Sequence, residues 1–318
     1  MNRDKENLSQ WSPHSRQFKR AVLLRKYEAQ RLELLQTAAE VNTYSDTSCL
    51  PNEILERIFS IYIDTYAEDL DIDLLVKASK PYGYFKITHI CRHWRKVAHR
   101  HAALWTRLMV PQISPRYQEG DKLMLRLSKS FPLHVDIDGP RHRWKDHELL
   151  MNESHRIQTL NITFNRCYDR YPEGDYFTSD GAEELLARLV TETPILQSLT
   201  IQSSCLRSTE TFNRSCAGPT SLKSFRAIGF ELDVITPFCQ PSITHLYLIS
   251  NKHTHSRQTL VQVLSLLPQL KVLELVDAIG LTVEKDAVWT PSVHLNALNK
   301  LLIVDSFDRL AWFFTIFS

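Results

Sequence analysis

The chain has 318 residues, 43% of them hydrophobic, and its 38 basic and 36 acidic side chains give a formal net charge of +2. This length leaves room for about two domains, and the composition is that of a folded globular protein. Because the charges nearly cancel, we expect neither a nucleic acid nor a membrane surface as the main partner.

The six cysteines are scattered, and none of them forms a C-x-x-C pair. Since the chain also begins with polar residues rather than a signal peptide, we expect reduced thiols in an intracellular protein, cytoplasmic and/or nuclear. No apolar run approaches the roughly 20 residues of a membrane span.

The N-terminal part predicts one long helix. Residues 1–15 are polar and are expected to form a disordered tail, and residues 16–47 are expected to form a helix, from Arg16 to Val41, and its linker. Apolar residues follow in this helix at alternating steps of three and four, at Leu24, Tyr27, Leu34, Ala38 and Val41. Because this pattern is short for an independent coiled coil, we favour packing against the domain that follows; a dimerisation helix is the alternative.

A second helix is predicted from Leu50 to Ile63. Pro51 and Glu53 are start signals, because proline lacks an amide hydrogen and a carboxylate suits the positive helix end. Apolar residues at positions 54, 55, 58, 59, 61, 62 and 63 cover more than one side of the helix. Packing on a single domain requires a stripe of only roughly 100°, so we expect the second side to bind a partner.

A third helix is predicted next, and its apolar residues share one face: Ile87, Ile90, Cys91, Trp94, Val97 and Ala98. The segment with Leu104, Trp105 and Leu108 is expected to close a small helical core, which ends at Pro111.

These segments carry a resemblance to a known family. Leu-Pro-x-Glu-Ile-Leu-x-x-Ile-Phe, then Cys-Arg-x-Trp-Arg-x-Val-Ala, then Leu-Trp-x-x-Leu resembles an F-box, most closely the F-box-like proteins that are numerous in mushroom-forming fungi. The resemblance covers residues 48–110, and it departs from compact F-boxes in a long polar insert at residues 67–84.

The resemblance implies docking on a Skp-type adaptor and, through it, on the cullin of an SCF-type ubiquitin ligase. The residues that it implies for docking are Leu50, Pro51, Ile54, Leu55, Ile58 and Phe59, with Trp94, Val97 and Trp105 supporting or completing the surface.

Residues 111–318 contain a recurring apolar pattern of the form L-x-x-L-x-L. Its six copies begin at Ile157, Leu196, Leu222, Ile243, Leu270 and Leu298, and the last four steps are 26, 21, 27 and 28 residues. Steps of about 20–29 residues are typical of leucine-rich repeats. Prolines at 194, 241 and 268 precede three copies and are expected to stop preceding helices, two of which are predicted around residues 185–190 and 260–267. Leu133, Val135 and Ile137 indicate an earlier strand.

The predicted fold is therefore α/β: an N-terminal helix and a small all-α F-box, followed by an irregular leucine-rich-repeat solenoid of parallel strands backed by helices. Strand residues that alternate with the buried positions are expected to line the inner, substrate-binding surface: Asn161, Thr200, Arg226, Tyr247 and Glu274. The chain ends on an apolar stretch, residues 311–318, with no polar capping unit. Either this tail folds back as the cap or the chain is truncated, and we favour truncation.

The sequence gives no indication of catalysis. His89 and His93 are spaced to share a metal on one helix, but no further ligand is evident, so surface histidines are the favoured interpretation. No glycine-rich phosphate loop and no G-x-S-x-G motif is present. We expect no catalytic residue, cofactor or metal.

The predicted function is that of a substrate receptor, which docks through the F-box and presents a protein substrate on the repeats. One alternative is an F-box scaffold that delivers no substrate for degradation. The other is an enzyme whose site is assembled from scattered residues, against which the shortage of glycine and of acid–base clusters argues.

Overall fold

The computed structural model of the chain describes residues 12–45, 50–72, 83–110, 118–138, 148–164, 191–203, 219–250, 257–279 and 293–315. The chain divides into two compact units, Met1–Asp69 with Gly83–His101, and Leu70–Tyr82 with Ala102–Ser318.

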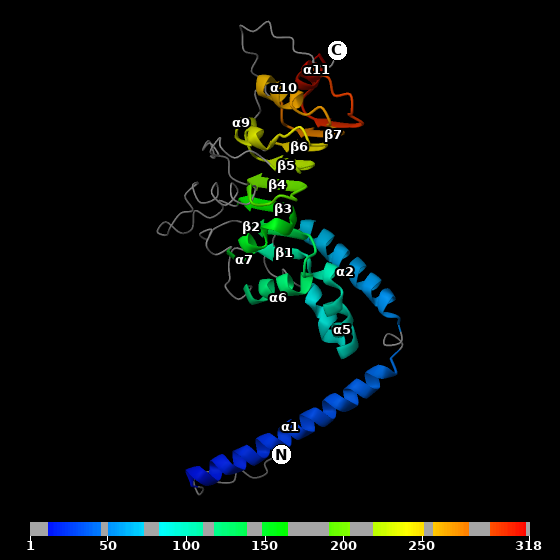
Figure 1. Cartoon of the computed structure of the whole chain (residues 1–318), viewed down its shortest axis with the longest axis vertical. Helices are drawn as coiled ribbons and strands as arrows, with labels where there is room; N and C mark the ends of the chain where they lie inside the picture. Colours follow the sequence, from blue (N-terminus) through cyan, green and yellow to red (C-terminus); the bar gives the residue numbers. More distant parts are fainter. Residues whose placement is uncertain are drawn as a thin grey trace. The chain divides into compact units, whose positions relative to one another are not determined.

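The first unit begins with the helix α1, which spans Pro13–Thr43 and confirms the predicted N-terminal helix (Figure 1). It starts within the tail that was expected to be disordered, because Ser12 caps it: the Ser12 hydroxyl accepts a hydrogen bond from the Ser15 amide at 3.3 Å, and Pro13 follows the cap. No residue of α1 is buried. The favoured packing of this helix against the following domain is therefore slight: residues near its end only line a cavity together with residues of the 89–95 segment.

The rest of this unit consists of α2 (Asn52–Ile72), the short 3₁₀ helix η3 (Gly83–Lys86), α4 (Ile87–Ile90) and α5 (Arg92–Arg100). Leu55, Phe59 and Ile63, at four-residue steps on α2, are buried, as are Val97 and Ala98 on α5. The Phe59 and Trp94 rings pack with their centroids 5.1 Å apart, so α2 and α5 share one core.

The continuous helix predicted over residues 87–98 is wrong, because the chain breaks at Cys91. This residue is extended (φ −152°, ψ 172°), and its thiol accepts a hydrogen bond from the Trp94 amide at 3.4 Å, which makes it the cap of α5. The break turns Ile90 out of the predicted apolar face, and its side chain is 56% exposed.

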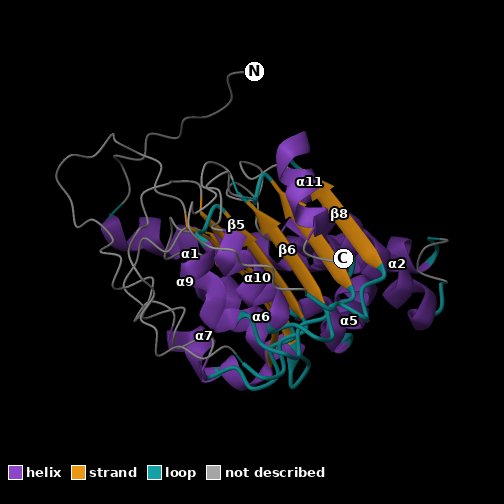
Figure 2. Cartoon of the chain, turned by 90° about the horizontal axis from the view of Figure 1, so that it is seen from above, coloured by secondary structure: helices purple, strands orange, loops and turns teal. Residues whose placement is uncertain are grey.

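The second unit is built on one sheet of parallel strands in the order β1-β2-β3-β4-β5-β6-β7-β8 (Figure 2). The strands are β1 (Arg107–Val110), β2 (Leu133–Asp138), β3 (Ile157–Phe164), β4 (Ser198–Ser203), β5 (Ser224–Ile228), β6 (His245–Ile249), β7 (Val272–Val276) and β8 (Lys300–Val304). Helical segments join them: η4 (Ala102–Trp105), α6 (Gln118–Ser128), α7 (Glu148–Asn152), η7 (Ser154–Arg156), α9 (Leu232–Ile235), η8 (Thr236–Phe238), α10 (Arg257–Ser265) and α11 (Phe307–Thr315).

This arrangement confirms the predicted parallel strands. All six copies of the apolar pattern run into strands, β3 to β8, and the predicted earlier strand is β2. The prediction for Leu108 is wrong: it lies in β1, paired with Val135 of β2, rather than in the helical core. The helix predicted around residues 185–190 lies outside the described residues. The eight strands and their helices are consistent with a solenoid-like repeat domain.

One face of the sheet is the core of this unit. Each strand from β2 to β7 buries at least two alternating residues, such as Leu246 and Leu248 of β6. Segments between the strands cover them: Phe238 of η8 packs on Phe225 of β5 with ring centroids 5.8 Å apart, and Leu260 of α10 is fully buried. The first residue of each copy from Ile157 to Leu270 is also fully buried, as expected for the point where the chain turns into the strand.

The edge strand β8 is less covered, and Leu301 is 38% exposed where its neighbour in register, Leu273, is buried. The helix α11 follows β8 and folds back toward α10, because the Arg257 guanidinium lies 4.7 Å from the centre of the Trp312 ring. Asp305 fixes this connection: its carboxylate accepts hydrogen bonds from the Ile279 amide at 3.1 Å and from Arg309 at 2.9 Å.

A buried arginine joins α6 to the start of β3. Arg156 is 5% exposed and donates to the Glu153 carboxylate at 2.7 Å, to the Ser128 hydroxyl at 3.1 Å and to the Phe131 carbonyl at 3.0 Å. These hydrogen bonds satisfy groups that burial would otherwise leave unpaired.

We therefore expect Arg156→Met to lower the free energy of unfolding by about 1–3 kcal/mol, the usual cost of leaving buried hydrogen-bonding groups without a partner. The matched control is Arg126→Met on the exposed side of α6, which should cost under about 0.5 kcal/mol. Urea unfolding of both variants measures the difference, and equal stabilities would contradict the role given to Arg156.

The alternation of buried and open strand positions gives a second prediction. Leu246→Ala empties a fully buried position and should cost about 2–5 kcal/mol. Leu302→Ala makes the same change at a position that is 43% exposed and should cost well under half as much. Comparable losses in thermal unfolding would show that the assigned faces are incorrect.

Candidate functional site

The exposed side of α2 carries an apolar stripe. Ile54, Ile58 and Ile61 follow at steps of four and three, so they lie on one side of the helix, and they are 48%, 40% and 52% exposed. Tyr62 beside them is 38% exposed. The second apolar side predicted for this helix is therefore open in the structure, while the Leu55 side is buried.

The residues predicted to dock an adaptor divide into two groups by burial. Pro51, Ile54 and Ile58 are exposed, and Leu50 is half-buried. By contrast, four of the predicted residues are at most 4% exposed and lie in the core: Leu55, Phe59, Val97 and Trp105. These four offer a partner no surface in this structure, so only the first group is placed for direct contact.

Trp94 is half-buried, with its ring against Phe59. Its indole nitrogen is buried and has no hydrogen-bond partner among the residues that the structure describes. This placement fits a core residue better than a contact residue.

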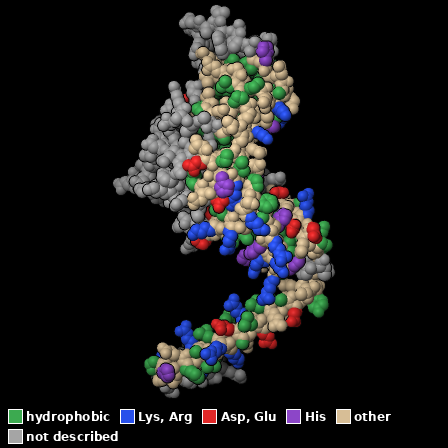
Figure 3. Space-filling view, viewed as in Figure 1, with side chains coloured by type: hydrophobic (Ala, Val, Ile, Leu, Met, Phe, Trp, Pro, Cys, Tyr) green, Lys and Arg blue, Asp and Glu red, His purple; other side chains and the backbone are tan. Residues whose placement is uncertain are grey.

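The helix α5 has a strongly basic exposed side. Arg92, Lys96 and Arg100 follow at four-residue steps, Arg95 is also exposed, and α5 contains no acidic residue. Lys, Arg and His side chains gather around this helix in the space-filling view (Figure 3). At the end of α5, His101 Nδ1 lies 3.2 Å from Glu56 of α2 and links the two helices.

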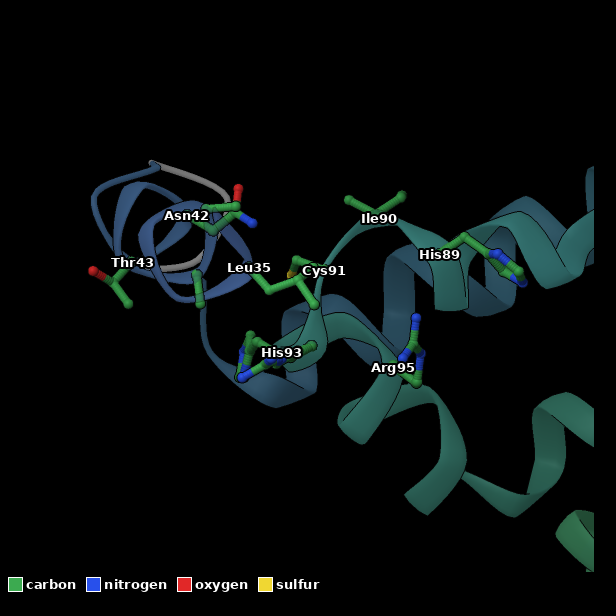
Figure 4. Close-up of a pocket in the computed structure, with 11 residues that line it drawn as sticks. Leu35, Asn42, Thr43, His89, Ile90, Cys91, His93 and Arg95 are labelled. Carbon is green, nitrogen blue, oxygen red and sulfur yellow. The ribbon is translucent and has the colours of Figure 1, made fainter. Parts of the chain in front are cut away.

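A cavity of about 630 Å³ lies between the end of α1 and the α4–α5 turn. Figure 4 shows Leu35, Asn42 and Thr43 of α1 on one side, and Ile90, Cys91 and His93 near the turn. The break at Cys91 puts His89 and His93 on different helices, so they do not share the helical face on which a metal pair was considered. Among the described residues, no group of three or more His, Cys, Asp or Glu side chains is placed to hold a metal ion.

The five residues predicted to face a substrate form one row across the open side of the sheet. In the strand register, Asn161 of β3 pairs with Thr200 of β4, Thr200 with Arg226 of β5, Arg226 with Tyr247 of β6, and Tyr247 with Glu274 of β7. Arg226 is exposed, and the other four are half-buried. The structure therefore brings all five together in one row.

Two charge clusters flank this row, and sequence reasoning missed their partners. At one end, Asp136 of β2 accepts hydrogen bonds from Asn161 at 2.6 Å and from Arg107 at 3.2 Å. At the other end, Lys300 of β8 pairs with Glu274 at 2.7 Å, and this hydrogen bond raises the pKa of Lys300. Asp136 could have been found by extending the row to the earlier strand, where it is the residue between Val135 and Ile137.

Burial shifts the pKa of Cys239 and of His134 in this unit. Burial raises the pKa of the Cys239 thiol to about 12, so this thiol is protonated at neutral pH and is a poor nucleophile. Burial and the charge of Arg107 lower the pKa of His134, which favours the neutral imidazole. Within the described ranges, no helix is both long and apolar enough to cross a membrane.

Comparison with known proteins gives one match and one negative result. The F-box-like family model matches residues 47–110, which include α2, α4, α5, η4 and β1. No curated protein matches the chain. F-box domains are generally adaptor or interaction modules rather than enzymes, and they typically bind Skp1-type adaptors. Residues 47–110 of this chain are thus identified as an F-box-like domain.

Proposed function

We propose that this chain is the substrate-receptor subunit of an SCF-type cullin-RING ubiquitin ligase. The observation that carries this proposal is the exposed apolar stripe of α2, which lies inside the F-box-like match and has no cover in the described residues of the chain. An exposed apolar helix side is suited to an apolar groove on a partner. The proposed partner is a Skp-type adaptor, and through it a cullin.

In this proposal, Ile54 and Ile58 contact the adaptor directly, together with Leu50 and Pro51 at the start of the helix. Burying one isoleucine side chain contributes roughly 1.5–3 kcal/mol, so a few such residues dominate an interface of this kind. The remaining residues of the predicted set act indirectly: Leu55, Phe59, Trp94 and Val97 hold α2 and α5 in place, and Trp105 lies in the core of the second unit.

The sheet of the second unit is proposed to present a protein substrate on the row from Asn161 to Glu274. We interpret its strands as irregular leucine-rich repeats, with residues 48–110 as the docking domain and residues 111–318 as the presenting domain. The chain itself would perform no chemistry. It would raise the effective concentration of the substrate near a charged ubiquitin-conjugating enzyme, which suits an intracellular protein.

Docking can be tested with one exposed residue and its neighbour. Ile58→Asp should weaken binding of a purified Skp-type adaptor by at least about 10- to 150-fold, because the burial of one isoleucine is lost and a charge is placed in an apolar contact. Isothermal titration of the purified full chain measures this change.

The matched control is Arg57→Asp, which introduces the same side chain at an adjacent exposed position outside the stripe. It should leave the adaptor affinity within about threefold of the wild type. Leu55→Asp is not an equivalent test, because Leu55 is fully buried and its substitution would unfold the helices. An unchanged affinity of a folded Ile58→Asp variant would refute the docking assignment.

Substrate delivery separates a ligase receptor from a scaffold. When cullin activity is inhibited in cells, proteins bound by the wild-type chain should accumulate, because their ubiquitylation stops. Cells that carry only Ile58→Asp should already show the raised level, and inhibition should add little. If the abundance of the bound proteins changes neither on cullin inhibition nor with Ile58→Asp, the scaffold alternative is favoured. Quantitative mass spectrometry of the co-purified proteins provides the measurement.

A further inference from the structure

We propose that Arg226, at the centre of the open sheet face, binds an anionic side chain, a carboxylate or a phosphate, of an extended segment of the substrate. This inference rests on the proposed function, since it assigns a chemistry to the surface that presents the substrate. The strand register and the charges around Arg226 support it.

The neighbours of Arg226 on the open face are uncharged or imidazole side chains. The parallel register places eight residues around it: Ser198, Thr200 and Gln202 on β4, Ser224 and Ile228 on β5, and His245, Tyr247 and Ile249 on β6. None of these neighbours is acidic, and most of them carry a hydroxyl or amide group. Arg226 is exposed, and within the described residues no carboxylate forms an ion pair with it.

The acidic residues of the same row are already engaged. Asp136 is held by Arg107 and Asn161, and Glu274 is held by Lys300. The described strand side chains of this face therefore leave one unpaired charge, that of Arg226. A guanidinium surrounded by neutral hydrogen-bond donors is complementary to an oxyanion, because both the charge and the donors favour it.

Tyr247 restricts the position of this charge. The Arg226 guanidinium carbon lies 6.0 Å from the centre of the Tyr247 ring, within the range of a cation–π contact. A guanidinium held beside the ring loses less side-chain freedom when it binds an anion than a free one would. The hydroxyl of Thr200, on the other side of Arg226 in the row, is a second donor for the same anion.

The length of the row fits a short linear segment. Four strand spacings of about 4.8 Å separate Asn161 from Glu274, or about 19 Å in all, and an extended chain covers this distance with about six residues. A segment laid across the strands with its anionic side chain near the middle would meet Arg226.

Peptide selection on the full-length protein tests this chemistry without a known substrate. The probe is a library of random dodecapeptides displayed on phage, selected against the wild-type chain and three variants. Wild type and the control Lys223→Gln, which removes an exposed charge just before β5, should both enrich Asp and Glu. Arg226→Gln should lose this enrichment, and Arg226→Glu should instead enrich Lys and Arg, a gain that an unfolded variant could not show.

Synthetic versions of the best acidic peptide then distinguish the two sources of negative charge. Replacing its key Glu by Gln should weaken binding about tenfold or more, the value of a charged hydrogen bond. If phosphoserine at that position binds more tightly than Glu, phosphate is the preferred anion; the reverse order assigns a carboxylate. Fluorescence anisotropy gives both affinities.

Two results would overturn the inference: selections on wild type without acidic enrichment, or acidic enrichment that survives in both Arg226 variants. Adaptor binding is measured on the same preparations and does not depend on Arg226. Either of these two results, obtained with intact adaptor binding, would therefore refute only the inference, whereas failure of the wild type to bind the adaptor would refute the proposed function.

Discussion

The in-register pairing of parallel strands is the constraint on which the second unit depends. Each strand from β2 to β7 buries at least two side chains on one face and pairs its backbone with both neighbours. A shift of one residue would turn the buried pair, such as Leu246 and Leu248, to the open face and bury Tyr247 in their place. The same register therefore determines the core on one side and the row that contains Arg226 on the other.

The helix α2 has two apolar sides, one that packs on its own unit and one that is left for a partner. Leu55 and Phe59 bind it to its own unit, and Ile54 and Ile58 remain for a partner. Side chains four residues apart on a helix lie on one side, so two adjacent apolar stripes fit on α2 without either disturbing the other. Cys91 adds a second condition: by capping α5, it fixes the helix that carries Trp94 against Phe59.

Sequence periodicity was enough to predict the strands and the row on the open face, because both follow from a period of two within copies of one pattern. It was not enough to decide which of the two apolar stripes of α2 is buried, since Ile54 and Leu55 are chemically alike. The break at Cys91 was missed because a thiol is an unusual helix cap. The strand β1 was missed because it is only four residues long and closely follows the helical segment that ends at Trp105.

The open face has a consequence for specificity. A charged residue whose partners all lie within the protein contributes little to recognition, because a ligand must first compete with those partners. Asp136 and Glu274 are in that situation, and their ion pairs keep the ends of the row closed to a second charge. Because each end of the row carries a paired acid and base, it is locally neutral. It therefore repels a wrongly placed anion or cation only weakly. Discrimination between segments would then depend on one central charge, Arg226, and on its surrounding donors, so that a neutral segment would leave the desolvated guanidinium unpaired and bind weakly.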